Sequence, residues 1–338
     1  MYNSEQKQTF LNTITNDNSY KSFQRVFKAV QDMEEKFGKD ICEMNVDELL
    51  TVLDFKTGVR ITNTEQTMSL LRSYVDWCIQ NGKTTSENNF DKISSSEVDK
   101  TRTCRARYVK SPAEFEEMIK IAFGMNVDYN ESTEIPNELM VRLCYVGLEN
   151  EEIVLLEKAN VDYEAKMIKS PLYDCVYHVS DRILKLCRFC AEQEEVLLMA
   201  KFGMRKERVC SNKYLFRNRL GTLRGKSEDS PLNKLVIPRK VKAFSDAYVE
   251  STGNYKAISC DKLRESKMLY DIYESGETFD AYFNQVILPD IKMRNPEYTE
   301  RKIQERRRIL KGMYDLYKET VSFIKISFVK IQKNYRNG

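Results

Sequence analysis

The sequence predicts a mainly helical fold with one small β-element, divided between two domains. Apolar residues recur at helical spacing over most of the chain, and capping residues mark where several of these stretches begin. Residues 161–179 alone have the β-branched and aromatic composition of short strands. A polar stretch separates two ordered regions, and 338 residues are enough for each region to bury a core of its own.

The first domain is expected over residues 1–83 and is wholly helical. Residues 22–37 carry phenylalanine, valine and methionine close to the i, i+3, i+4, i+7 positions of an amphipathic helix. Asn45 and Glu48 have the spacing of a capping box, which predicts the start of a second helix. A third helix ends at Gly82, since glycine commonly follows the last helical residue.

Residues 84–107 are expected to be an interdomain linker, because they are rich in serine and poor in large apolar residues. Order resumes in a second domain, residues 108–338. Its first helix is marked by Ser111 as N-cap and by Pro112 at the first helical position, where a missing N–H costs nothing.

The second domain is expected to be helical around a small sheet and to end in a long helix. Met167–Ile168 and residues 176–179 are the segments that can pair as strands. Ser180 then caps the following helix. From Glu300 a long helix begins basic and becomes apolar at Val321, Ile324, Phe328 and Ile331, which share one face.

Composition excludes several classes of protein. No apolar run approaches the roughly 20 residues that span a bilayer, and the N-terminus lacks the features of a signal peptide. Nine cysteines without a regular spacing favour a reducing cytoplasm. Cys187 and Cys190 form one C-x-x-C without a second pair, and His178 is the single histidine. We therefore expect buried free thiols, no metal and no cofactor.

Charge is distributed unevenly along the chain. Residues 201–242 contain 13 Lys and Arg against 3 Asp and Glu, whereas residues 113–165 contain 13 acidic residues against 3 basic ones. A basic stretch of this length, with Tyr214 and Phe216 interleaved, is typical of a surface that binds nucleic acid. A nucleic acid is therefore the expected partner.

One helical turn resembles a known active-site box. The segment Gly147-Leu148-Glu149-Asn150-Glu151-Glu152-Ile153 follows an apolar helix and precedes the candidate strands. This order resembles the first box of the tyrosine recombinases, the phage integrase family. In that family the residue after Gly-Leu is an arginine that grips the scissile phosphate. Here it is Glu149, so the resemblance implies a recombinase fold without the first phosphate clamp.

The rest of the chain resembles the same family in the order of its parts. Residues 258–264 resemble the His-X-X-Arg box, with Arg264 at the arginine position and Asp261 at the histidine position. Tyr298 follows Arg264 at about the separation along the chain that is expected for the nucleophile of the family. The family's Leu-Gly-His appears only as residues 287–289, Ile-Leu-Pro. The hairpin lysine of the family corresponds to either Lys166 or Lys169.

These departures oppose strand cleavage. Attack by a tyrosine on a phosphodiester needs cations to neutralise the charge that develops on the phosphate. At ~5 Å and an effective dielectric of ~20, a carboxylate repels a phosphate by roughly 3 kcal/mol. We expect Glu149 or Asp261 to pair with Arg264 and to fill the former phosphate site. We further expect Tyr298 to be an ordinary packed or surface residue.

The resemblance also implies a fold class, double-stranded DNA as the partner and a set of residues that contact it. The fold class is mainly α with a small β-sheet, a helical SAM-like core-binding domain followed by a tyrosine-recombinase-like catalytic-fold domain. Residues 213–217 resemble the segment before the groove-facing helix, and Ser230 resembles the start of that helix. The expected contacts are Lys21, Arg25, Lys28, Lys56, Arg60, Asn63, Arg72, Lys213, Arg217, Arg219, Arg224, Lys226, Asn233, Arg239, Lys240, Lys242 and Arg264.

Two functions compete, with a third behind them. The first is a cytoplasmic, sequence-specific DNA-binding regulator that has lost cleavage, and the chain resembles recombinase-derived repressors of lysogeny in SPβ-type Bacillus prophages. The second is an active recombinase that uses Tyr298 in an atypical site. The third is a noncatalytic accessory protein that organises DNA. In the recombinase family the C-terminal helix often docks on a neighbouring subunit, so self-association through this helix is also expected.

Overall fold

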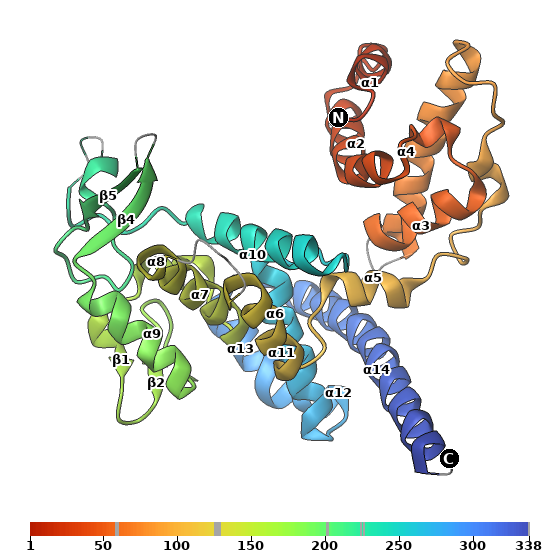
Figure 1. The fold of residues 1–338 in the computed structure, drawn as a ribbon. Helices are drawn as coiled ribbons and strands as arrows, with labels where there is room; N and C mark the ends of the chain where they lie inside the picture. Colours follow the sequence, from red (N-terminus) through yellow and green to blue (C-terminus); the bar gives the residue numbers. More distant parts are fainter. Residues whose placement is uncertain (58–60, 125–129, 201–202, 224, 226, 337–338) are drawn as a thin grey trace. The chain divides into compact units, whose positions relative to one another are not determined.

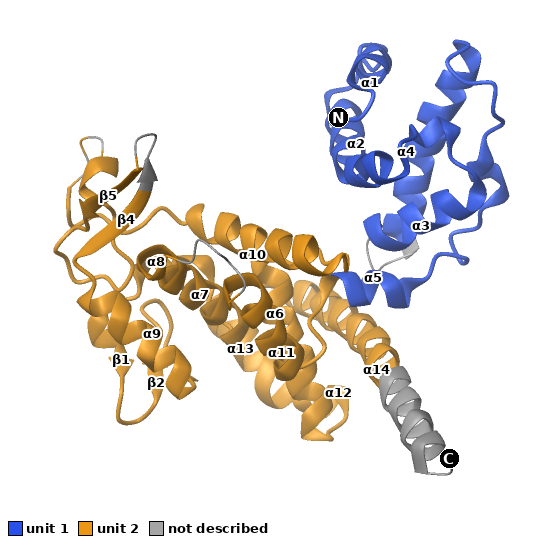
Figure 2. Ribbon diagram, viewed as in Figure 1, with its two compact units in different colours: residues 1–106 blue, residues 107–338 orange. Residues whose placement is uncertain are grey.

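The computed structural model describes residues 1–57, 61–124, 130–200, 203–223, 225 and 227–336. The chain divides into two compact units, Met1–Ala106 and Arg107–Gly338, coloured separately in Figure 2. Each unit has its own hydrophobic core.

Unit 1 is helical throughout its described residues. Its core joins apolar side chains from all of its long helices, among them Phe27, Leu53 and Tyr74. The expected capping box is present at Asn45 and Glu48. Gly38 ends another helix with a left-handed backbone conformation, φ 65°. The elements of unit 1 are α1 (Ser4–Leu11), α2 (Asp17–Phe37), η1 (Ile41–Glu43), α3 (Val46–Lys56), α4 (Ile61–Gln80), η2 (Asn89–Lys92) and α5 (Lys100–Arg107).

The segment that we expected to be a linker, residues 84–107, is largely folded into unit 1. It forms η2 and α5, and its few large apolar side chains, Phe90, Ile93 and Val98, are buried in the core of unit 1. Composition suggested a linker because these apolar residues are sparse. Three well-placed side chains are nevertheless enough to hold a short segment against an existing core.

Unit 2 is a helical body with two small sheets (Figure 1). Its helices are α6 (Pro112–Gly124), α7 (Glu131–Val146), α8 (Asn150–Leu155), η3 (Lys158–Asn160), α9 (Asp181–Glu192), η4 (Leu220–Thr222), α10 (Val236–Thr252), α11 (Cys260–Ser275), α12 (Phe279–Tyr282), the π-turn η5 (Phe283–Ile287), α13 (Leu288–Arg294) and α14 (Glu300–Arg336). Its strands are β1 (Val161–Asp162), β2 (Met167–Lys169), β3 (Val176–His178), β4 (Glu195–Ala200) and β5 (Gly203–Arg208).

The first sheet has the pairing that the sequence predicts. Strands β1, β2 and β3 form an antiparallel meander in which Ile168 is opposite Tyr177. Ser180 caps α9 directly after the sheet, as expected. The second sheet is a two-stranded hairpin of β4 and β5 and was not anticipated from the sequence. Strand β4 precedes the basic stretch, and β5 lies within it.

Helix α7 is the centre of unit 2 and leads directly to the candidate box. It contacts α6, α8, α9, α10 and α11. Every side chain from Glu138 to Tyr145 is buried, and a helix that is covered on all sides belongs to the middle of a core. The end of α7 is therefore held rigidly, and the turn that follows it has a fixed position.

The expected fold class, mainly helical with small sheets, is confirmed. The expected C-terminal helix is present as α14, although the side chains of its apolar end, including Ile324, Phe328 and Ile331, lie outside the described residues. No helix within the described ranges is both long and apolar enough to cross a membrane.

Candidate functional site: an ionic pocket and a basic surface

Four positions that the sequence assigned to a degenerate active site line one pocket of unit 2. Glu149, Asp261, Arg264 and Tyr298 all border a pocket of about 470 Å³ between the end of α7 and helices α11, α13 and α14. They come from segments up to about 150 residues apart in sequence. The structure therefore places all four side chains around one pocket, while their role stays a prediction.

The turn that carries Glu149 is set by the glycine before it. Gly147 ends α7 at φ 128°, a backbone conformation that side chains rarely adopt, and the ring of Tyr177 lies 3.5 Å from where a Cβ would be. Leu148 is fully buried and anchors the turn in the core. Glu149 then becomes the N-cap residue of α8 and lies at the pocket edge, 37% exposed.

Glu152 is the structural centre of the box, a role that the sequence did not reveal. It is fully buried, yet all of its acceptor capacity is used. One oxygen accepts hydrogen bonds from the hydroxyls of Ser170 (2.6 Å) and Tyr177 (2.8 Å). The other accepts from the backbone N–H of Glu149 and from Arg294, both at 2.8 Å. A buried carboxylate with four donors ties the box, the first sheet and α13 together.

Arg294 supplies the cation of this network and was missed by sequence reasoning. Its guanidinium lies 2.8 Å from Glu152 and from Asp290, and 3.5 Å from Glu149. Burial alone would lower its pKa, but the hydrogen bonds that Arg294 donates to Glu152 and Asp290 outweigh burial and raise it. Asp290 precedes Arg294 by one helical turn, so this pair could have been anticipated, whereas the pairing with Glu152 across 142 residues could not.

Arg264 is paired inside the pocket, as expected, and its partner is Asp261. The two side chains form an ion pair one turn apart on α11, and Arg264 also donates to the carbonyl oxygen of Leu148 at 3.4 Å. Glu149 pairs with Arg294 instead of Arg264. Asp261 is therefore the carboxylate that pairs with Arg264, the arginine of the His-X-X-Arg-like segment.

Tyr298 lies at the pocket edge in the turn before α14. Its backbone N–H donates to Asn295 at 3.0 Å, and the ammonium group of Lys302 lies 5.2 Å from its ring centre. The side chain is half-buried. The turn places Tyr298 beside the same pocket as Arg264, which is the arrangement that the alignment requires.

The pocket as a whole is a poor place for a phosphate. Five carboxylates and four basic side chains line it. Three arginines border the pocket, and two of them, Arg264 and Arg294, already have carboxylate partners. A phosphodiester would have to displace the buried Glu152 from Arg294 or the 73% exposed Asp261 from Arg264, and it would meet further carboxylates beside them.

The basic stretch presents some of its expected DNA contacts to solvent. Arg239 and Lys242 are exposed on α10, and Asn233 is exposed just before this helix. Lys213 is exposed and lies 2.6 Å from Glu157. Exposed ion pairs of this kind are worth little, so these side chains remain available to a phosphate.

Two residues of the basic stretch are used within the fold. The guanidinium of Arg217 donates to the carbonyl oxygens of Cys190 (2.9 Å), Cys210 and Gln193, which joins the end of α9 to the strand region. Arg219 lies 3.4 Å from Glu207 on β5. Arg217 therefore has few donors left for DNA. Arg224 and Lys226 lie outside the described residues.

The groove-facing helix begins later than the resemblance implied. We expected its start at Ser230, but α10 begins at Val236. Pro231 and Asn233 belong to the preceding loop, and Pro238 falls in the first turn of the helix, where its missing N–H is tolerated. Lys240 is half-buried on this helix.

Unit 1 presents a second group of expected contacts. Lys21, Arg25 and Lys28 are exposed along α2, and Asn63 is exposed in the first turn of α4. Lys21 lies 3.8 Å from Asp17, a weak surface pair. These four residues remain candidates for DNA contact.

Two other cations of unit 1 serve its own packing. Lys56 is almost buried in an ion pair with Asp32. Arg72 donates to the carbonyl oxygen of Phe90 at 2.8 Å and lies 3.0 Å from Asp91, so it fastens η2 to α4. Arg60 lies outside the described residues.

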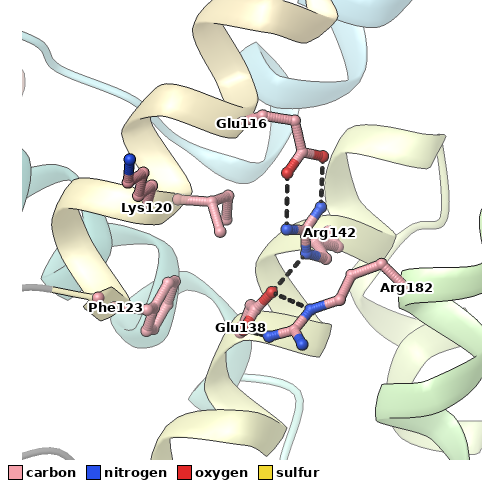
Figure 3. Close-up of a pocket in the computed structure, with 8 residues that line it drawn as sticks. Glu116, Lys120, Phe123, Glu138, Arg142 and Arg182 are labelled. Carbon is pink, nitrogen blue, oxygen red and sulfur yellow. Dashed lines mark hydrogen bonds and ion pairs between the residues drawn. The ribbon is translucent and has the colours of Figure 1, made fainter.

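A second pocket of unit 2, about 540 Å³ in volume, contains an ionic network (Figure 3). Arg142 is buried and donates to both oxygens of Glu116, at 2.6 and 2.8 Å, and to Glu138 at 2.7 Å. Arg182 approaches Glu138 from α9 at 2.7 Å. Burial opposes ionisation of Glu138, but hydrogen bonds from the two arginines outweigh it and lower its pKa. The network holds α6, α7 and α9 together.

The expectation for the cysteines agrees with the structure. All nine are free thiols, and Cys187 and Cys190 are buried. Burial raises the pKa of Cys187 to about 12, so its thiol is unreactive at neutral pH. Among the described residues no group of three or more His, Cys, Asp or Glu side chains is arranged to hold a metal ion.

Comparison with known proteins gives one match in sequence and several in structure. Residues 1–80 match the family model described as MrpR, N-terminal core-binding domain. No curated protein matches. A solved structure of XerA recombinase is 12% identical, with 90% of this chain and 96% of that chain covered and a TM-score of 0.37.

Two integrase structures are similar at the same level. The integrase from mycobacterium phage Brujita is 13% identical, with 93% of this chain and 91% of that chain covered and a TM-score of 0.33. A lambda integrase dimer bound to a COC′ core site is 10% identical, with 88% and 78% covered and a TM-score of 0.32. The family match confirms the prediction that the chain begins with a core-binding domain.

Proposed function

We propose that this protein is a sequence-specific DNA-binding regulator with a recombinase-like architecture that holds DNA without cutting it. Its natural setting would be a prophage, as a repressor of lytic genes. The observation that carries the proposal is the pairing of two of the three pocket arginines with carboxylates of the chain itself, Arg264 with Asp261 and Arg294 with Glu152 and Asp290.

The first support is the chemistry of the pocket. Cleavage by Tyr298 would require cations that are free to stabilise negative charge on the phosphate. Replacement of a cation by Glu149 converts an attraction into a repulsion of roughly 3 kcal/mol at ~5 Å and an effective dielectric of ~20. Since each 1.4 kcal/mol is about a factor of ten, the total change corresponds to several decades in rate.

The second support is that basic side chains outside the pocket are exposed to solvent. Arg239 and Lys242 on α10, and Arg25 and Lys28 on α2, are exposed and surrounded by solvent. Basic side chains from both units would hold phosphates, while residues near Asn63 and along 233–242 would read base edges. Loss of chemistry combined with retention of this surface favours a binding protein.

Recovery of genomic DNA bound by the purified full chain, followed by affinity measurements on the recovered sites, tests the proposal. We expect a defined set of sites whose affinity falls about 10³-fold or more between 50 and 200 mM salt, because phosphate contacts release counterions. A variant with Arg239→Ala and Lys240→Ala should bind severalfold more weakly at moderate salt. Unchanged affinity would refute the role of these two residues, and failure to enrich any sequence would refute the proposal.

A second candidate function, an active recombinase with an atypical site, is favoured by one observation. Tyr298 borders the same pocket as Arg264, and Arg306 of α14 borders it as well. The variant Tyr298→Phe separates the two functions. It should leave binding and repression unchanged in a regulator, and it should abolish recombination in an enzyme.

A further inference from the structure

Helix α10 has one face in the core and the opposite face in solvent. Ile237, Val241 and Phe244 are buried in the core of unit 2. The opposite face carries Arg239 and Lys242, both exposed, and Asp246, whose carboxylate pairs with the 75% exposed side chain of Lys242. A single helix that presents a basic face to solvent has the width and charge that fit the major groove of DNA.

An apolar side chain begins this basic face. Leu235, the residue directly before α10, lies four positions before Arg239 and seven before Lys242, so all three share one side of the helix. Leu235 is 57% exposed, the highest value among the large apolar side chains that the structure describes. No apolar neighbour covers most of this side chain in the free protein.

The start of α10 lies close to α8. Lys234 forms an exposed ion pair with Glu151 of α8, the helix whose N-cap is Glu149. The amide N–H of Leu235 donates to the side chain of Asn233 at 2.9 Å. These contacts restrain the backbone at Leu235, whose side chain extends into solvent.

We propose that Leu235 reads the methyl group of a thymine in the major groove of the bound DNA site. This inference rests on the proposed function and adds a chemical class of target to it. The thymine 5-methyl group is the apolar feature of the major groove, and it is recognised by contact with apolar side chains. Arg239 and Lys242, on the same face, would hold the flanking phosphates and fix the depth at which Leu235 enters the groove.

Substitution of single thymines by deoxyuridine tests this contact, because deoxyuridine lacks only the methyl group. The full-length protein and the variant Leu235→Ala would be titrated against a recovered site in which each thymine in turn is replaced. Removal of the contacted methyl should weaken binding by the wild type about fourfold, the value for burying one methyl group. The same replacement should leave the affinity of Leu235→Ala unchanged, since its side chain no longer reaches the methyl.

A matched control is Leu172→Ala, which removes a side chain that is 43% exposed and lies outside the basic stretch. This variant should keep the wild-type loss at the same thymine. Equal losses for wild type and Leu235→Ala at every thymine would overturn the inference while leaving DNA binding intact. A change of molecular mass in solution on Leu235→Ala, without any change in the deoxyuridine profile, would also overturn it and would assign Leu235 to a protein contact. Absence of any bound DNA would instead overturn the proposed function.

Discussion

Replacement of Arg294 by methionine should destabilise unit 2 strongly. The change keeps most of the side-chain volume but removes the cation that faces the fully buried Glu152. Removal of one partner from a buried ion pair costs about 3–5 kcal/mol, because the remaining charge is left in a medium of low dielectric. Glu152 keeps its donors from Ser170, Tyr177 and the N–H of Glu149, so we expect the lower end of this range.

The magnitude can be measured by urea denaturation of the full chain at pH 7, and by thermal melting. A loss of about 3 kcal/mol corresponds to about 6–12 °C in a domain of this size. The double variant Arg294→Met, Glu152→Gln is the control, since a neutral amide needs no cation and part of the lost stability should return. If Arg294→Met unfolds within about 1 kcal/mol of the wild type, the network around Glu152 does not support the box as described.

Two further predictions concern buried charges elsewhere. Burial outweighs the attraction of Lys7 and raises the pKa of Glu34 from 4.5 to about 7. The folded state therefore binds this proton more tightly than the unfolded state does. The free energy of unfolding should fall as pH rises from about 4.5 to about 7. The variant Glu34→Gln should lack this fall in urea titrations between pH 4.5 and 8, and a wild-type stability that is flat over this range would contradict the assignment. In the second network, Glu138→Gln should cost about 3 kcal/mol, because Glu138 is buried between two arginines. Glu116→Gln should cost less than about 1 kcal/mol, since Glu116 is 58% exposed, and equal losses would refute this distinction.

The sequence predicted those parts of the fold that depend on local spacing. The capping box at Asn45, the cap at Ser180 and the pairing of segment 167–168 with segment 176–179 all follow from residues that are close in the chain. The family resemblance assigned Arg264 and Tyr298 to one site, and both side chains border one pocket, but their role stays a prediction.

The features that were missed depend on partners that are distant in sequence. Nothing local marks Arg294 as the partner of Glu152, because the pairing exists only once α13 packs beside α8. The segment 84–106 was misjudged for the same reason, since burial of Phe90 is decided by helices elsewhere in unit 1. The hairpin of β4 and β5 was missed because neither strand alternates: β4 is an apolar run after Glu195, and β5 is mostly charged.

The central claim is that this protein holds DNA and does not cleave it. Incubation of the full chain with a nicked suicide substrate, built from a recovered binding site, measures cleavage directly as a covalent protein–DNA adduct on a denaturing gel. We expect tight binding of this substrate and no adduct, because Arg264 and Arg294 are paired with carboxylates. An adduct that forms with the wild type and disappears in Tyr298→Phe would contradict it.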